Sequence, residues 1–217
     1  HPQYLCLLSE SYKERLKEYC DLPENYVRCI PNPNTYENIK IIPRKEPILL
    51  FVGRLYNKAK KIDYLIDIWQ QLYKQCPQWK LVIVGDGPDK YTLVNKSKDI
   101  PGIEFVGRQD PCPYYEKASI FCMTSIFEGF PMCLTEAMQF GCVPIAFDSF
   151  SAVYDIIKPG ETGELVKSFD KKEYVGKLIH LIDDETYRKK LSKNAFQYVK
   201  RYDIANILPK WIELIEK

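Results

Sequence analysis

Two glutamates, Glu128 and Glu136, lie eight residues apart on either side of a predicted helix start. The apolar run 119–123 before them is typical of a buried strand, and Pro131 suits a first helical turn because its missing N–H removes no helix hydrogen bond. Gly141 is a natural helix stop. A strand, a glycine-containing turn and a helix with free amides form a site suited to a phosphate or another anion. We expect Glu128 at the mouth of that site and Glu136 further along the helix.

Two cations follow the first predicted strand of the main sheet. Arg54 comes directly after Gly53, and Lys60 follows six residues later, before a predicted crossover helix. Both would lie at the carboxyl edge of the sheet, where open α/β sheets bind ligands, and two fixed positive charges suit a diphosphate. Either cation alone is better explained as a solvated surface group, but their position beside Gly53 and near the helix mouth at 130–133 favours a phosphate site.

The glycines Gly85 and Gly87 invite comparison with a dinucleotide-binding loop. That fingerprint fails because Lys90 replaces its third glycine and because the loop follows a later strand. Two alternatives remain open: a turn in which Asp86 caps a helix opened by Pro88, or a loop that faces a ligand. A P-loop motif is also absent from the sequence.

Each glutamate has a simpler explanation taken alone, since Glu128 could cap the helix and Glu136 could be solvated. The neighbours of Glu136, which are Leu134, Ala137 and Met138, nevertheless predict a largely buried helix. A buried carboxylate needs hydrogen-bond donors, because an unpaired buried charge is costly. Ribose hydroxyls are donors of this kind.

The elements that must position these residues alternate between strands and helices. Several strands are apolar on both faces, which predicts a doubly wound, mostly parallel Rossmann-like α/β sheet covered by helices. The predicted strands are residues 48–52, 80–84, 103–106, 119–123 and 143–147. Helical spacing of apolar residues predicts a crossover helix with Ile62, Leu65, Ile66, Trp69 and Leu72 on one face. A short helix is expected over 113–118.

The two ends of the chain depart from this alternation, and we divide it into residues 1–30, 31–202 and 203–217. The first part holds a strand over 4–8 and a helix that starts at Ser9, and the proline-rich run 30–34 forms the boundary. Two more helices follow around 174–181 and 191–198. The last part is an amphipathic helix behind Asp203, a plausible cap, with Pro209 kinking or restarting it. We expect its apolar face to pack on the same chain rather than on a membrane.

Composition excludes several classes of protein. The 217 residues include 31 basic and 29 acidic side chains that are interleaved, so no strong field invites nucleic acid. The eight cysteines form no C-x-x-C pair, which predicts reduced, mostly buried thiols in a cytosolic protein. Histidine is scarce, so zinc binding and histidine acid–base chemistry are not expected. The chain lacks an initiator methionine and a signal pattern, and we expect it to be part of a longer protein.

Five motifs in order resemble the retaining nucleotide-sugar glycosyltransferases of family 4, the group 1 transferases. They are residues 53–55, 60–63, 84–88, 105–107 and the pair 128–131 with 136–138. The resemblance covers roughly residues 31–217 and implies the donor-binding carboxyl half of the two-domain GT-B architecture. Residues 1–30 resemble the last strand and helix of the amino-terminal acceptor half, most of which is absent.

The resemblance implies a role for each matching position. Arg54 and Lys60 would hold the diphosphate and stabilise charge on the departing nucleotide. Glu128 would contact the donor sugar, and Glu136 would bind the ribose. Further donor contacts would come from Gly53, Gly85, Val106, Gly107, Gly129, Phe130, Pro131, Met132 and Cys133. Val106 and Gly107 would lie against the base, while amides of Phe130, Met132 and Cys133 would bind sugar or phosphate.

The resemblance also implies the reaction and its partners. A sugar would pass from a nucleotide-diphosphate donor to a saccharide or lipid-linked saccharide acceptor, which would bind through the absent amino-terminal half. The acceptor would attack from the leaving-group face, so that configuration is retained, and neither a metal nor a cofactor is required. We expect a cytoplasmic enzyme of bacterial surface polysaccharide or lipopolysaccharide biosynthesis, at the inner membrane face in its full-length form. This piece alone would bind donor weakly and transfer nothing.

Two departures from the family pattern affect the phosphate ligand. Lys61 stands where many relatives carry glycine, and the loop between Arg54 and Lys60 is one residue longer than usual. Lys58 and Lys61 are therefore alternatives to Lys60. Two other functions stay open: a GT-B epimerase or phosphorylase, and a non-catalytic module that binds a nucleotide sugar.

Overall fold

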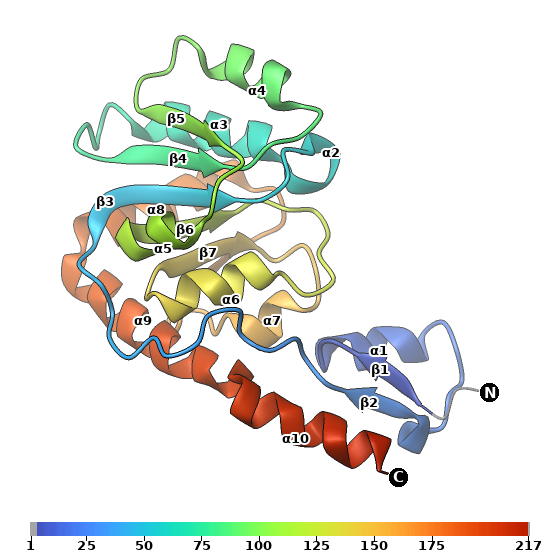
Figure 1. The fold of residues 1–217 in the computed structure, drawn as a ribbon. Helices are drawn as coiled ribbons and strands as arrows, with labels where there is room; N and C mark the ends of the chain where they lie inside the picture. The colour runs from blue at the N-terminus through green and yellow to red at the C-terminus, as the bar shows by residue number, and fades with distance from the viewer. Residues whose placement is uncertain (1–3, 217) are drawn as a thin grey trace.

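The computed structural model describes residues 4–216, and a six-stranded sheet forms its centre (Figure 1). The strand order is β5-β4-β3-β6-β7-β8, and all neighbouring strands are parallel. These strands are β3 Glu46–Val52, β4 Lys80–Val84, β5 Ile103–Gly107, β6 Ala118–Met123, β7 Val143–Phe147 and β8 Glu164–Val166. The predicted fold class is confirmed.

The strand order places a topological switch between β3 and β6. The chain builds β3, β4 and β5 toward one edge, then crosses back and adds β6, β7 and β8 on the other side of β3. In open α/β sheets, ligands bind outside the carboxyl ends of the strands at such a point. A ligand is therefore expected beside the segments that follow β3 and β6, which are residues 53–61 and 124–131.

Helices cover both faces of the sheet (Figure 1). Alternate residues of β3 point to opposite faces: Leu49 and Phe51 pack with α3 and α8, whereas Ile48 and Leu50 pack with α5 and α6. The helices after β3 are α2 Asn57–Lys60, α3 Ile62–Leu72, α4 Lys90–Ser97, α5 Cys112–Lys117, α6 Met132–Gln139, α7 Val153–Ile156, α8 Lys171–Asp183, α9 Glu185–Tyr198 and α10 Ile204–Ile215. All five apolar positions predicted for the crossover helix are buried in α3, which confirms that helix.

Two strands of three residues each were not predicted from the sequence. They are β8 and the strand β2, Val27–Cys29. In β8, the charged residue Glu164 interrupts the apolar pattern, although it is buried. Two partners make this burial tolerable: Tyr187 donates a hydrogen bond to the carboxylate at 2.5 Å, and Lys177 forms an ion pair with it at 3.3 Å. A partnered charge took the place of an apolar residue, so the apolar pattern could not reveal this strand.

The amino-terminal unit, residues 4–30, forms a sheet of its own. It contains β1 Leu5–Leu7, α1 Ser11–Lys17, the 3-10 helix η1 Glu24–Tyr26 and β2, and β1 pairs with β2 in parallel. This small sheet shares no strand with the six-stranded sheet. The division of the chain at residues 30 and 203 stays a prediction.

The expectation that the last helix packs its apolar face on the same chain is wrong for the described residues. Within α10 only Ile207 is buried. The large apolar side chains of α10 that stay exposed are Ile204, Leu208, Trp211, Ile212 and Ile215. The helix extends away from the sheet toward the amino-terminal unit, so the sheet cannot cover it (Figure 1). It is also continuous, because Pro209 lies inside it without restarting it.

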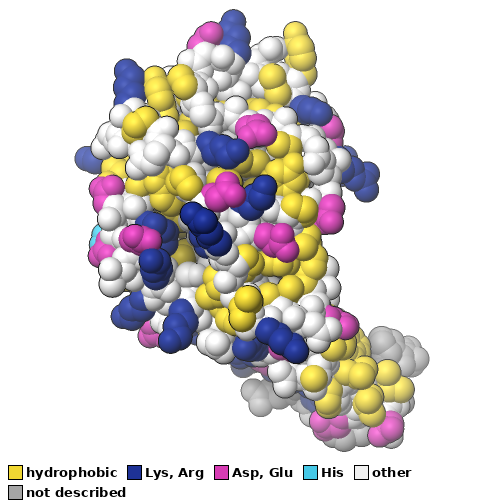
Figure 2. Space-filling view, turned by 60° about the vertical axis from the view of Figure 1, so that its left-hand side comes forward, with side chains coloured by type: hydrophobic (Ala, Val, Ile, Leu, Met, Phe, Trp, Pro, Cys, Tyr) yellow, Lys and Arg dark blue, Asp and Glu magenta, His cyan; other side chains and the backbone are white. Residues whose placement is uncertain are grey.

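Asp203 occupies the position before α10, but its side chain does not cap the helix. Its carboxylate instead accepts a hydrogen bond from Asn34 at 2.7 Å. The expected cap is therefore wrong, because a partner distant in sequence holds the carboxylate. A view of another face shows hydrophobic side chains gathered on the projecting lobe at the chain ends, and charges of both signs interspersed over the larger body (Figure 2).

Candidate functional site

The loops after β3 and β4 pack back to back at the carboxyl edge of the sheet. Gly53 donates its amide to Val84 O at 3.0 Å, and Leu55 donates to Asp86 O at 2.9 Å. Gly85 has φ +144°, and a Cβ there would lie 1.9 Å from the Gly53 oxygen. Only glycine fits such a close approach. Gly85 therefore has a packing role whether or not a ligand also contacts this loop.

Of the two alternatives for the loop that contains Gly85 and Gly87, the helix cap at Asp86 is wrong. The helix α4 begins at Lys90, and Pro88 lies in the turn before it rather than in its first turn. Asp86 accepts the Gly87 amide at 2.8 Å and the Lys90 ammonium at 2.7 Å, so its carboxylate closes the turn. Hydrogen bonds from Lys90 and Gly87 lower the pKa of Asp86.

The segment after β3 turns sharply at Lys61, which adopts a left-handed conformation with φ +48°. It ends α2 and precedes the first residue of α3. A left-handed residue is strained unless it is glycine, and glycine is what the family resemblance implied at this position. Lys61 thus separates α2, which ends with Lys60, from α3.

Lys60 and Glu128 meet, although they come from segments that follow different strands. Lys60 Nζ lies 2.5 Å from Glu128 Oε1, and the side chains are 22% and 12% exposed. Ser125 donates to the same oxygen at 2.6 Å. Backbone contacts support this arrangement, because the Ile126 amide donates to Ala59 O at 2.8 Å. Among the described residues Glu128 Oε2 has no hydrogen-bond partner, so it is available to a hydroxyl donor.

The other candidate cations behave differently. Lys58 is exposed, and the Lys61 ammonium lies 5.3 Å from the centre of the Tyr64 ring. Arg54 is exposed and makes no hydrogen bond or ion pair with any residue of the described chain. Of the three candidate lysines, the structure brings Lys60 to Glu128, while Arg54, on the same segment after β3, has no partner among the described residues.

The helix α6 opens beside Glu128. It begins at Met132 with Pro131 as its N-cap, one residue later than predicted, and Gly141 with φ +76° follows its end as expected. The amides of Met132 and Cys133 have no helical carbonyl one turn earlier to bond. A Cβ on Gly129 would meet no atom within 4 Å, so the space beside the loop is open.

The side chains of this helix mouth are largely structural. The Phe130 ring is buried and packs edge-on against Tyr202, with the ring centres 5.5 Å apart. Burial raises the pKa of the Cys133 thiol to about 12, so the thiol stays neutral. The buried Phe130 ring therefore leaves only the backbone of this residue for a donor contact.

Glu136 lies on α6 but already has donors from the protein. The Tyr115 hydroxyl donates to Oε2 at 2.8 Å, and the Thr35 hydroxyl donates to Oε1 at 2.7 Å. With these two partners, the Glu136 carboxylate does not need ribose hydroxyls to satisfy it. Binding of the ribose by Glu136 stays a prediction.

The residues expected near the base end β5. The Gly107 carbonyl accepts the Gly85 amide at 2.8 Å, and Gly107 has φ +77°. Val106 is half-buried, and its carbonyl accepts a hydrogen bond from Gln109 at 3.0 Å. The structure thus joins the ends of β3, β4 and β5 into one backbone surface.

Two site residues escaped the sequence analysis. Ser125 lies three residues before Glu128, and a hydroxyl so close in sequence could have been found. Tyr12 donates its hydroxyl to the carbonyl oxygen of Glu128 from 116 residues away. No local pattern predicts a contact at that separation.

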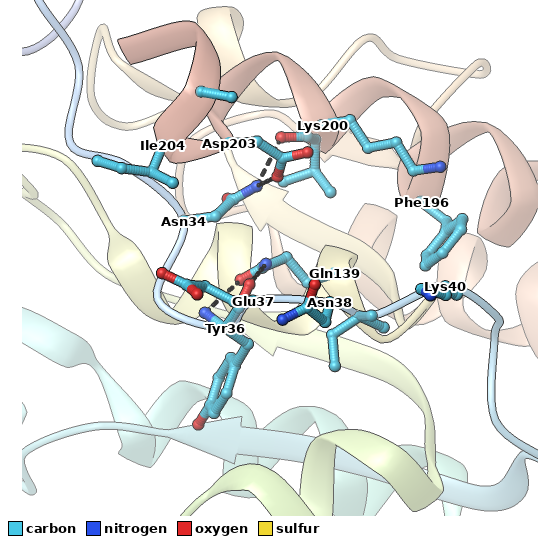
Figure 3. A pocket seen from close by; sticks show the side chains of 13 residues that line it. Asn34, Tyr36, Glu37, Asn38, Lys40, Gln139, Phe196, Lys200, Asp203 and Ile204 are labelled. Atoms are coloured by element: carbon cyan, nitrogen blue, oxygen red, sulfur yellow. Dashed lines mark hydrogen bonds between the residues drawn. The ribbon is translucent and has the colours of Figure 1, made fainter. Parts of the chain in front are cut away.

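A pocket of about 460 Å³ lies elsewhere, between the linker at 34–40 and the carboxyl-terminal helices (Figure 3). Gln139 holds this linker by accepting the Tyr36 amide at 3.3 Å and donating to the Tyr36 carbonyl at 2.6 Å. Asn34 donates to Val199 O at 2.9 Å as well as to Asp203. None of the predicted site residues lines this pocket.

Within residues 4–216, no group of three or more His, Cys, Asp or Glu side chains is placed to hold a metal ion. No helix in this part of the chain combines the length and apolar character that crossing a membrane requires.

The sequence matches the family described as glycosyl transferases group 1 over residues 34–198. That match covers more than half of the chain, and the chain belongs to this family. It is 33% identical over 218 residues to the amylovoran biosynthesis glycosyltransferase AmsD of Erwinia amylovora, covering 96% of this chain and 61% of that protein.

A second relative is a Campylobacter jejuni alpha-1,4-N-acetyl-D-galactosaminyltransferase, named for a saccharide on PP-undecaprenol. It is 33% identical over 173 residues, which cover 79% of this chain and 48% of that protein. The chain thus spans about half to three fifths of the length of these relatives.

Solved structures share the fold. The lipopolysaccharide outer core galactosyltransferase WaaB, in its apo form, matches with a TM-score of 0.82 and 27% identity over 98% of this chain and 61% of that one. A TarM variant in complex with UDP matches with a TM-score of 0.90 and 21% identity over 99% of this chain and 44% of that one. The second likeness shows the fold alone.

Proposed function

We propose that this chain is the donor-binding, carboxyl-terminal half of a retaining family 4 glycosyltransferase with the GT-B architecture. The contact between Lys60 and Glu128 carries the proposal. It joins the segments after β3 and β6 at the switch point of the sheet, where a ligand is expected. A cation, a carboxylate with one unused oxygen, and unbonded helix amides are what a sugar diphosphate requires.

In the proposed mechanism, Lys60 and the unengaged Arg54 bind the diphosphate of the donor. As the bond from the anomeric carbon to the diphosphate breaks, negative charge grows on the departing oxygen, and fixed cations stabilise it. Oε2 of Glu128 accepts hydrogen bonds from sugar hydroxyls and so orients the anomeric carbon. The acceptor hydroxyl attacks from the leaving-group face and passes its proton to a donor phosphate oxygen, so that configuration is retained.

The remaining donor contacts follow from the same placement. The amides of Met132 and Cys133 bind sugar or phosphate, Val106 and Gly107 lie against the base, and Glu136 binds ribose by sharing or exchanging its present donors. The reaction requires neither a metal nor a cofactor. No nucleic acid takes part.

The acceptor is proposed to be a saccharide or lipid-linked saccharide, bound through an amino-terminal half, in bacterial surface polysaccharide or lipopolysaccharide biosynthesis. Support comes from the relatives, one named for amylovoran biosynthesis and one for a saccharide on PP-undecaprenol. The full-length protein would work in the cytoplasm at the inner face of the membrane.

Calorimetric titration tests the donor site on this chain. UDP, GDP and ADP, and then UDP-glucose, UDP-N-acetylglucosamine and GDP-mannose, are titrated into the wild type. We expect one nucleotide to bind, and its sugar conjugate to bind more tightly. The substitution Glu128→Gln should remove the gain due to the sugar and leave the nucleoside diphosphate affinity within about twofold. Failure of every nucleotide to bind would refute the proposal.

A further inference from the structure

Among the described residues, one hydrogen bond fixes the backbone between residues 127 and 130. Between the Ile126 amide, which donates to Ala59 O, and the Leu134 amide, which donates to Pro131 O, no described main-chain amide of this loop has a backbone acceptor. The carbonyls of residues 127–130 have one described hydrogen-bond donor among them, the Tyr12 hydroxyl on Glu128 O. Gly129 follows immediately, and glycine leaves the chain more freedom than any other residue.

We propose that Tyr12 is a positioning residue for the donor sugar. By donating to the carbonyl of Glu128, it holds the backbone while Lys60 and Ser125 hold the side chain. Oε2 is then presented to the sugar in one place. The effect of Tyr12 on the donor sugar rests on the proposed function, whereas its hydrogen bond to Glu128 is present in the ligand-free structure. A group already in place when the ligand arrives spares the free energy of ordering it.

The amino-terminal unit holds Tyr12 at this position through Asp155 of α7. Ser11 donates its amide to Asp155 at 3.1 Å and its hydroxyl at 2.7 Å, and Ser9 donates its hydroxyl to the same carboxylate. The Asp155 carbonyl in turn accepts the Tyr202 hydroxyl at 2.9 Å. One path of hydrogen bonds therefore runs from the carboxyl-terminal helices through α1 to the Glu128 loop.

The chemistry of Tyr12 suits a permanent donor. Its side chain is half-buried, and burial raises the pKa of its hydroxyl, so the proton stays on the oxygen at neutral pH. Phenylalanine would keep the ring and its packing and remove only the hydrogen bond. Tyr19 provides the matched control, because its side chain is 75% exposed and lies just beyond the end of α1.

The first measurement is amide hydrogen exchange of the ligand-free chain, wild type against Tyr12→Phe and Tyr19→Phe. A neutral hydrogen bond contributes enough that its loss should speed exchange of the hydrogen-bonded amides that flank the loop, Ile126 and Leu134, by about three- to tenfold. The Tyr19→Phe variant should match the wild type. Unchanged exchange in Tyr12→Phe would refute the proposal whether or not any nucleotide binds.

The second measurement separates positioning from simple loosening of the fold. UDP, GDP, UDP-glucose, UDP-N-acetylglucosamine and GDP-mannose are titrated into the same variants. In Tyr12→Phe the nucleoside diphosphate affinity should stay within about twofold, while the gain due to the sugar falls about three- to tenfold. An equal loss for both ligands, or an intact sugar gain despite faster exchange, would overturn the role. If the wild type binds no nucleotide, the donor-site proposal fails and exchange alone decides whether Tyr12 fixes the loop.

Discussion

Glu128 and Glu136, the two glutamates of one motif, have different hydrogen-bonding environments. Glu128 sits on an irregular loop, and Lys60 and Ser125 share one of its carboxylate oxygens while the other is unused within the described chain. Glu136 sits on a regular helix, and Tyr115 and Thr35 occupy both of its oxygens. The loop glutamate keeps one oxygen open for the proposed ligand, whereas both oxygens of the helix glutamate are bonded to the protein. Two identical side chains eight residues apart can therefore differ in role, since one can be available to a ligand while the other stabilises the fold.

The largest expected effect concerns the cation that faces Glu128. Lys60→Ala should weaken binding of the nucleoside diphosphate at least tenfold, because a charge-assisted hydrogen bond contributes about 1.5–3 kcal/mol. Lys58→Ala, two residues away in the same short helix but exposed, should change the affinity less than about twofold. Calorimetry at two salt concentrations measures both. Equal losses in the two variants would show that general surface charge, and not the Lys60 position, attracts the anion.

The next effect tests the helix glutamate. Glu136→Gln keeps one acceptor oxygen but removes the charge that Tyr115 and Thr35 bond, and we expect a loss of about 1 kcal/mol in the free energy of unfolding. Glu128→Gln should lose less stability and more sugar affinity. Urea unfolding followed by circular dichroism gives the first quantity. The contrast between the two glutamates is broken if Glu136→Gln unfolds at the same urea concentration as the wild type.

The stability of the contact between α1 and the Glu128 loop should depend on pH. The carboxylate of Asp155 anchors α1, and Tyr12 of α1 bonds the Glu128 carbonyl. Burial raises the pKa of Asp155, but hydrogen bonds from Ser9 and Ser11 outweigh it, and the net pKa lies below the usual 3.8. A depressed folded-state pKa adds stability above the unfolded pKa that is lost as the pH falls below about 3.8. Urea unfolding between about pH 6 and about pH 3, the window in which carboxyl groups titrate, should therefore show a smaller loss of stability on acidification in Asp155→Asn than in wild type. Parallel curves would contradict this.

The smallest effect concerns the turn that directs Lys60. Lys61→Gly should relieve the left-handed strain and raise the free energy of unfolding by at most about 1 kcal/mol, since glycine also gains freedom in the unfolded chain. Its partner, Lys61→Ala, keeps the strain and should not stabilise. Thermal unfolding of the pair distinguishes them. A glycine variant that melts below the alanine variant would show that the Lys61 side chain, near the Tyr64 ring, matters more than its backbone.

Much of the sheet could be predicted because its signals are local. The strands β4 and β7 have the predicted bounds, and the apolar stripe of α3 is buried as expected. Two of the failures share one cause, which is a partner outside the local sequence. Asp203 was expected to cap α10, but its carboxylate accepts a hydrogen bond from Asn34. The strand β8 was not predicted because it contains the charged residue Glu164, whose carboxylate is bonded by Tyr187 and Lys177.

The sequence by itself determined the doubly wound fold, the family and the positions that could face a sugar diphosphate, because apolar periodicity and motif order are properties of the chain. The tertiary structure decided which of those groups meet. It brought Lys60 rather than Lys58 to Glu128, gave Glu136 internal partners, and placed Tyr12 on the Glu128 backbone. Contacts across 68 or 116 residues depend on how the strands and helices stack, and no local pattern contains that information.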